Sequence, residues 1–255
     1  MAHDDSAGAR WLRLTPAGYR PRLRLVCFPH AGGAAGFYRD WPALMPAGVE
    51  LVAVQYPGRQ DRLTEPRIES MEEMTAGITG ALLPVLDTPV AFFGHSMGSA
   101  IAYETALRLE RRHGVVPVRL FVSGRGAPHA EPAGETHLGT DDHLVASVRA
   151  LGDLDAGIYD EPELRDLLLP TLRSDYKLIE THSPDRPVPV SAPVSALGGD
   201  DDPGCAPDEL LSWKEVTTAR YDRRVFPGDH FYLAAHRADV VAHVTSVLRL
   251  HPQLV

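Results

Sequence analysis

Short apolar runs alternate along the chain with longer segments in which apolar residues recur at helical spacing. Runs of five to seven mostly apolar residues are typical of strands buried on both faces of a parallel sheet. Six such runs are Leu23–Phe28, Leu51–Gln55, Pro89–Phe93, Val118–Ser123, Pro193–Leu197 and Arg220–Phe226. The helical patterns are Ile68–Leu86, Ser96–His113, Pro207–Val216 and Phe231–Leu250. This alternation predicts an α/β fold with a mostly parallel central sheet flanked by helices.

The connection between the fourth and fifth runs is longer than one crossover helix requires. It carries two helical patterns of its own, Asp141–Leu151 and Glu161–Thr181, bounded by proline-rich segments. Structured insertions of this kind commonly act as lids or binding elements. We therefore expect a single domain, 1–255, with a helical lid insertion at about 127–188. A helical excursion without a role is the alternative.

Composition and charge exclude several classes of protein. With 255 residues and 44% apolar residues, the chain can bury a sizeable core. A net charge of −9 argues against a nucleic-acid partner, which would require a basic surface. Cys27 and Cys205 cannot form a disulfide scaffold, and the acidic first residues do not resemble a secretory signal. No apolar run approaches the roughly 18 residues of a membrane span. We expect a cytoplasmic protein with no membrane partner.

A G-x-S-x-G motif, Gly94–Gly98, lies between a predicted strand and a predicted helix. A tight turn from strand to helix holds the serine of such a motif in a strained conformation with its Oγ exposed. Glycines on either side let the strand and the helix approach each other without a Cβ clash. We therefore predict that Ser96 is a nucleophile.

A serine nucleophile needs a base, which in α/β-hydrolases follows the acid along the chain. His230 comes after the last predicted strand and just before the last helical pattern, where it would face the serine. Other histidines that follow Ser96 are less well placed: His182, His236 and His243. Three aspartates follow the fifth apolar run, and a G-x-x-D turn beginning at Gly199 selects Asp202, with Asp200 as the alternative.

The turn His30–Gly33 follows the first apolar run and resembles the HGGG-type loop that supplies one oxyanion-hole N–H. The second N–H comes from the residue after the nucleophile, so we expect Ala31 and Met97 to be the donors. Neither a dinucleotide-binding glycine pattern nor a Walker lysine is present. The acidic cluster lacks the spacing of a calcium loop. We therefore expect no cofactor and no metal.

Four motifs in order, Cys27–Gly33, Gln55–Arg59, Phe93–Gly98 and Pro227–Phe231, resemble those of type II thioesterases, which are α/β-hydrolases. Leu167–Tyr176 is similar to the lid helices of that family. The resemblance implies a Ser–His–Asp mechanism that hydrolyses acyl groups from the phosphopantetheine arm of an acyl or peptidyl carrier protein. In polyketide and nonribosomal peptide assembly lines such hydrolysis removes stalled or misprimed groups. We expect a monomer.

The same catalytic residues would also serve a general carboxylesterase or an acyltransferase. A non-catalytic hydrolase-fold binding module is the alternative from a different class. The segment 129–185 holds 13 acidic and 4 basic residues, which would repel an acidic carrier protein. We therefore expect docking on a surface that carries arginines, either those of segment 6–24 or Arg59, Arg62 and Arg67.

Overall fold

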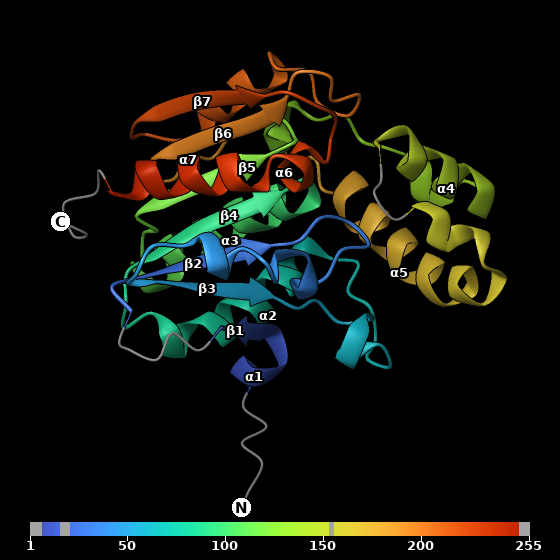
Figure 1. Ribbon diagram of the computed structural model, residues 1–255, viewed down its shortest axis with the longest axis horizontal. Coiled ribbons are helices and arrows are strands. Elements are labelled where there is room, and N and C mark those ends of the chain that lie inside the picture. The colour runs from blue at the N-terminus through green and yellow to red at the C-terminus, as the bar shows by residue number, and fades with distance from the viewer. Residues whose placement is uncertain (1–6, 16–20, 153–155, 250–255) are drawn as a thin grey trace, which may run out of the picture.

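The computed structural model describes residues 7–15, 21–152 and 156–249. Seven strands form one sheet in the order β1-β3-β2-β4-β5-β6-β7 (Figure 1). Their bounds are β1 Leu12–Leu14, β2 Leu23–Phe28, β3 Val49–Val54, β4 Val90–His95, β5 Arg119–Ser123, β6 Val194–Gly199 and β7 Tyr221–Phe226. All neighbours pair in parallel except β1, which runs antiparallel to β3 with Leu12 opposite Val54. The predicted α/β class with a mostly parallel sheet is confirmed.

Alternate residues of the strands face two separate helical layers. In β2, Val26 and Phe28 belong to the core cluster that also contains the buried hydrophobic residues of α2 (Met71–Leu82) and α3 (Met97–His113). Leu23, Leu25 and Cys27 face the opposite cluster, which is built with α6 (Tyr232–Ala235) and α7 (Arg237–Arg249). The inner strands β2 to β6 are therefore covered on both faces, which explains why they are mostly apolar, whereas the edge strand β7 holds exposed charged residues.

Two of the predicted helices differ from the expectation. The segment predicted as a helix at Pro207–Val216 is a 3₁₀ helix, η8 Glu209–Val216. The last predicted helix is divided at His236 into α6 and α7, and its expected final residue, Leu250, lies outside the described residues.

Shorter elements are α1 Ala7–Trp11, η1 Ala35–Tyr38, η2 Pro42–Leu44, η3 Gln60–Arg62, η4 Leu83–Val85, η5 Pro128–Ala130, η6 Thr136–Leu138 and η7 Ala156–Asp160. None of the described helices is both long and apolar enough to cross a membrane.

The segment between β5 and β6 forms helices α4 (Asp141–Ala150) and α5 (Pro162–Glu180). Figure 1 shows both at the end of the molecule toward which the parallel strands point. They share a small apolar cluster, to which Leu144 and Val148 of α4 and Leu169 and Leu172 of α5 contribute. The helices thus stand over the edge of the sheet where the loops after β2, β4 and β6 emerge.

Candidate active site

Ser96 occupies the turn between β4 and α3 with φ +53° and ψ −121°, a conformation rare for residues other than glycine. The Ser96 N–H donates to the Ser123 carbonyl oxygen at 2.7 Å, which fixes the turn to the end of β5. The Ser99 N–H donates in turn to the Ser96 carbonyl at 2.9 Å. The strained strand-to-helix turn expected around this serine is therefore present.

The two glycines of the motif permit close backbone contacts on both sides of this turn. A Cβ at Gly94 would lie 2.2 Å from the Gly98 carbonyl oxygen, and one at Gly98 would lie 2.0 Å from the Phe28 carbonyl oxygen. Both contacts are with backbone atoms, so a side chain could not be accommodated by a change of rotamer. The glycines let α3 begin directly against the ends of β2 and β4.

His230 and Asp202 form a buried pair at the same edge of the sheet. His230 Nδ1 lies 3.0 Å from Asp202 Oδ1 and 2.9 Å from Oδ2, and the two side chains are 4% and 0% exposed. The Gly204 N–H donates to Asp202 Oδ1 at 2.8 Å and so orients the carboxylate. A carboxylate facing Nδ1 favours the tautomer protonated there, in which Nε2 is the basic atom of the ring.

The neighbouring aspartates have other environments. Asp200 is exposed, and its Oδ1 accepts the Gly228 N–H at 2.8 Å. Asp201 is also exposed. Of the two candidates for the triad acid, the geometry thus pairs Asp202, and not Asp200, with the imidazole.

The imidazole of His230 lies beside the Ser96 turn. Its ring centroid is 4.9 Å from that of His95, the residue that precedes the serine. A Cβ at Gly124 would lie 2.7 Å from His95 Cε1 and 3.3 Å from His230 Cε1, so the glycine leaves room for both rings. Within the described part of the chain, no hydrogen bond joins the Ser96 hydroxyl to His230. Catalytic hydrogen bonds of this kind commonly tighten only when substrate binds.

The loop after β2 brings Ala31 to the site. Gly33 N–H donates to the His30 carbonyl at 3.0 Å, and Gly32 adopts φ +73°. Met97 is the first residue of α3, where a helix leaves the N–H without an internal acceptor. Neither the Ala31 N–H nor the Met97 N–H finds an acceptor among the described residues. Both expected oxyanion donors are therefore available to a bound substrate.

Two histidines that the sequence did not single out also line this region. His95 Nδ1 lies 2.9 Å from Ser123 Oγ, which in turn lies 2.7 Å from the Tyr232 hydroxyl. Burial lowers the pKa of His95, and burial together with the nearby His230 lowers the pKa of His30 to about 3. Both rings are consequently neutral at ordinary pH, and they add no positive charge beside the proposed base.

Of the three arginines expected on a carrier-docking surface, Arg67 is exposed, whereas the expectation is wrong for Arg59 and Arg62. Both are 5% exposed, and they pair with Asp175 and Glu65 respectively. In segment 6–24, Arg10, Arg13 and Arg24 form ion pairs with acidic side chains of the same chain. Arg20 lies outside the described residues.

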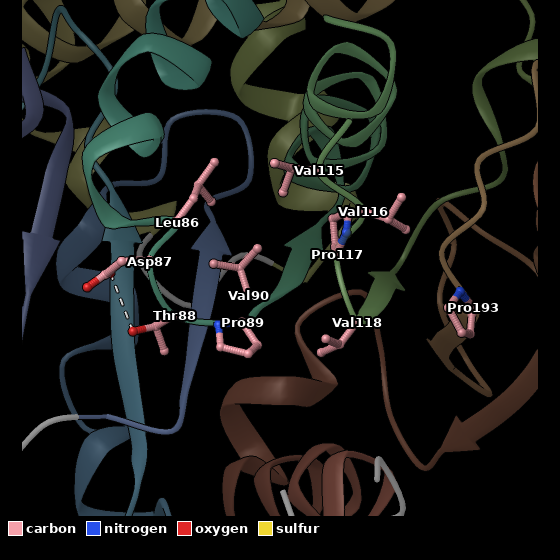
Figure 2. Close-up of a pocket in the computed structure, with 10 residues that line it drawn as sticks. All are labelled: Leu86, Asp87, Thr88, Pro89, Val90, Val115, Val116, Pro117, Val118 and Pro193. Carbon is pink, nitrogen blue, oxygen red and sulfur yellow. Dashed lines mark hydrogen bonds between the residues drawn. The ribbon is translucent and has the colours of Figure 1, made fainter. Parts of the chain in front are cut away.

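A hollow of about 450 Å³, shown in Figure 2, is separate from the site formed by Ser96, His230 and Asp202. Its lining comes from the chain at the amino-terminal ends of the strands: Leu86, Asp87, Thr88, Pro89, Val90, Val115, Val116, Pro117, Val118 and Pro193. Val90 begins β4, whereas Ser96 follows its other end, so the hollow and the Ser96 turn lie at opposite edges of the sheet. In the parts of the chain that the structure describes, no group of three His, Cys, Asp or Glu side chains could hold a metal ion.

Comparison with known proteins agrees with this geometry. The family model of the thioesterase domain matches residues 23–248. The chain is 41% identical over 250 residues to a probable cadicidin biosynthesis thioesterase of Streptomyces griseus, covering 97% of this chain and 68% of that protein. It is 42% identical over 224 residues to thioesterase PikA5 of Streptomyces venezuelae, covering 88% and 80% of the two chains.

Among solved structures, the type II thioesterase BorB from the borrelidin biosynthetic cluster superimposes with a TM-score of 0.81. It is 36% identical, and the match covers 97% of this chain and 98% of BorB. The resemblance to type II thioesterases that the four motifs predicted is confirmed. The chain belongs to the thioesterase domain family and has its α/β-hydrolase fold.

Proposed function

We propose that this protein hydrolyses acyl thioesters from the phosphopantetheine arm of acyl or peptidyl carrier proteins in a polyketide or nonribosomal peptide assembly line. The observation that carries the proposal is the buried Asp202–His230 pair beside the strained Ser96 turn. The names of the relatives support the substrate class, since cadicidin and borrelidin biosynthesis are the settings given for two of them.

In the proposed first half-reaction, Ser96 Oγ attacks the thioester carbonyl carbon while His230 Nε2 takes the hydroxyl proton. Asp202 holds the Nδ1–H tautomer and stabilises the imidazolium that forms. The N–H groups of Ala31 and Met97 donate to the oxygen that becomes negatively charged. The C–S bond then breaks, and His230 returns the proton to the departing pantetheine thiol.

In the second half-reaction, His230 removes a proton from water, and the resulting hydroxide attacks the acyl-Ser96 ester. The tetrahedral intermediate is again stabilised by the Ala31 and Met97 N–H groups. The C–O bond to Ser96 breaks, the proton returns to its oxygen, and the free acid leaves. Apart from the attacking water, this chemistry uses side chains and backbone groups of the chain itself.

The proposal assigns the insertion at about 127–188 the role of a lid within a single domain, 1–255. Its apolar cluster packs against Ala31, and Leu172 Cδ1 would lie 3.1 Å from a Cβ at Gly32. Leu151 Cδ2 would lie 2.7 Å from a Cβ at Gly204, next to the triad acid. The insertion therefore contacts both the oxyanion loop and the acid loop, which suits an element that covers bound acyl groups. The proposal also includes a cytoplasmic, monomeric enzyme.

The test compares kcat/KM for a panel of acyl-loaded carrier proteins with kcat/KM for a nitrophenyl ester, using wild type and Ser96→Ala. We expect carrier-bound thioesters to be the better substrates and Ser96→Ala to lose several orders of magnitude on all of them. A preference for the nitrophenyl ester would instead indicate a carboxylesterase. Acyl transfer to an added alcohol or amine in place of water would indicate an acyltransferase, and binding without turnover would indicate a binding module.

A further inference from the structure

Helix α5 of the insertion places a buried carboxylate directly against the oxyanion loop. Asp175 is 1% exposed, and its Oδ2 accepts the Gly32 N–H at 2.7 Å. Gly32 is the residue after Ala31, the proposed oxyanion donor, and it adopts φ +73°. A residue 143 positions further along the chain thus determines where one N–H of this loop points.

The Arg59 guanidinium completes this contact. Its Nη1 and Nη2 each donate to a different oxygen of Asp175 at 2.7 Å, and Nη1 also donates to the Gly33 carbonyl at 3.0 Å. The pair therefore holds the loop by two consecutive residues, Gly32 through its N–H and Gly33 through its carbonyl. Bidentate geometry of this kind fixes orientation as well as distance.

Arg59 is itself held by two residues that directly follow β3. The Gln55 side chain, fully buried after β3, donates from Nε2 to the Arg59 carbonyl at 3.2 Å and accepts the Ala35 N–H at 2.9 Å. The guanidinium lies 5.1 Å from the centroid of the Tyr56 ring, whose hydroxyl donates to the Pro29 carbonyl at 3.2 Å. The loop that holds Ala31 is thus braced from β3 on one side and from α5 on the other.

We propose that Asp175 and Arg59 are positioning residues for the oxyanion hole, an inference that rests on the proposed function. Because Asp175 binds the Gly32 N–H, that group points away from the substrate, and the Ala31 N–H remains as the donor from this loop. Arg59 neutralises the carboxylate, whose uncompensated charge would oppose the negative charge that develops on the substrate oxygen. The pair also couples the seating of α5 to the shape of the oxyanion hole.

The same helix offers a matched control. Lys177 Nζ donates to Glu69 Oε2 at 2.5 Å, so it also ties α5 to the body of the protein. That pair is about half exposed and does not touch the loop 30–33. Removing it perturbs the attachment of α5 without changing the direction of the Gly32 N–H.

The experiment uses Asp175→Asn, which keeps the size and an oxygen for the Gly32 N–H but sets an NH₂ group against Arg59 Nη2 and so breaks the bidentate pair. Arg59→Lys is the second variant, and Lys177→Gln is the control. Four quantities are measured: kcat and KM on an acyl-pantetheine thioester, the affinity of an acyl trifluoromethyl ketone, and the affinity of the corresponding acyl thioether. The ketone carbonyl accepts Ser96 Oγ and becomes a tetrahedral oxyanion, whereas the thioether reports only ground-state binding. Circular dichroism melting establishes that each variant is folded.

For Asp175→Asn and Arg59→Lys we expect kcat to fall on the order of ten- to a hundredfold, less than the loss of a whole oxyanion donor. The trifluoromethyl ketone should weaken by the same factor, while KM and thioether affinity stay near wild type. Lys177→Gln should leave all of these quantities unchanged.

The proposal is overturned if Asp175→Asn and Arg59→Lys keep wild-type kcat and ketone affinity, or if only KM rises, since the pair would then merely seat the lid. If Asp175→Asn does not fold, Arg59→Lys decides by the same criteria, and failure of both to fold makes the pair a structural one. A wild-type protein that neither hydrolyses the thioester nor binds the ketone defeats the proposed function instead, and this proposal with it.

Discussion

The substitution Asp202→Asn tests the assignment of the triad acid, with Asp200→Asn as its matched control. Asp202 Oδ1 accepts the Gly204 N–H at 2.8 Å, so the amide oxygen of an asparagine is best placed at that position. Its NH₂ group then stands where Oδ2 lies, 2.9 Å from His230 Nδ1, and an NH₂ group can only donate there. The amide oxygen also lies 3.0 Å from Nδ1, but a proton on Nδ1 would face the NH₂ group, which disfavours that tautomer. The substitution therefore favours an imidazole protonated on Nε2, the atom that has to accept the Ser96 proton.

This change of tautomer removes the base while it leaves the packing intact. In serine hydrolases an equivalent exchange lowers kcat by about four orders of magnitude, or about 5 kcal/mol. Asp200 is exposed, and an asparagine there can still accept the Gly228 N–H. We expect its kcat to stay within about threefold of wild type, as for other exposed substitutions.

The assay is single-turnover hydrolysis of an acyl-loaded carrier protein at saturating enzyme, with melting curves to show that both variants are folded. Single-turnover conditions report the chemical steps without a contribution from product release. The reasoning is refuted if Asp202→Asn retains activity within about tenfold of wild type, or if Asp200→Asn loses as much as Asp202→Asn does.

Two further predictions concern stability. Burial lowers the pKa of His30 to about 3, whereas in the unfolded chain it is about 6.5. Between these two pH values the unfolded chain binds a proton that the folded chain does not bind. The contribution to stability is therefore complete above this window and is lost as the pH falls through it. In urea unfolding, the loss of stability from pH 8 to pH 5 should be about 2 kcal/mol greater for wild type than for His30→Gln, and parallel pH curves would contradict this. Gly94→Ala should lower the free energy of unfolding by about 1–3 kcal/mol and remove most of the activity, since its Cβ would lie 2.2 Å from the Gly98 carbonyl oxygen. Gly80→Ala in α2, whose Cβ meets nothing within 4 Å, should instead stabilise by about 0.5–1 kcal/mol, and equal melting shifts for the two variants would show that the contact at Gly94 is unimportant.

The parallel part of the fold could be predicted because strands buried on both faces leave continuous apolar runs. The predicted Leu23–Phe28 strand, for example, coincides with β2. The edge strand β1, Leu12–Leu14, has only three residues, with an arginine in the middle, and leaves no such pattern. Over the eight residues of η8, a 3₁₀ period and an α-helical period also cannot be told apart from apolar spacing.

The residues proposed for catalysis could be chosen from the sequence because each lies in a short local motif. Ser96 is framed by glycines that the turn requires, and Asp202 follows from the spacing of a turn. The contact between Arg59 and Asp175 joins residues 116 positions apart, and no local pattern announces it. For the same reason, charge counts identified Arg59 as a docking residue, although the fold buries it against a carboxylate.

The central claim is that the acyl group passes through Ser96. The measurement that tests it most directly is rapid acid quenching of the enzyme mixed with a radiolabelled acyl carrier protein, followed by mass spectrometry of the labelled peptide. We predict a transient acyl ester on Ser96 that forms and decays at the rate of turnover and is absent from Ser96→Ala, which should not hydrolyse the substrate. An acyl ester on another residue, or undiminished turnover by Ser96→Ala, would contradict the account.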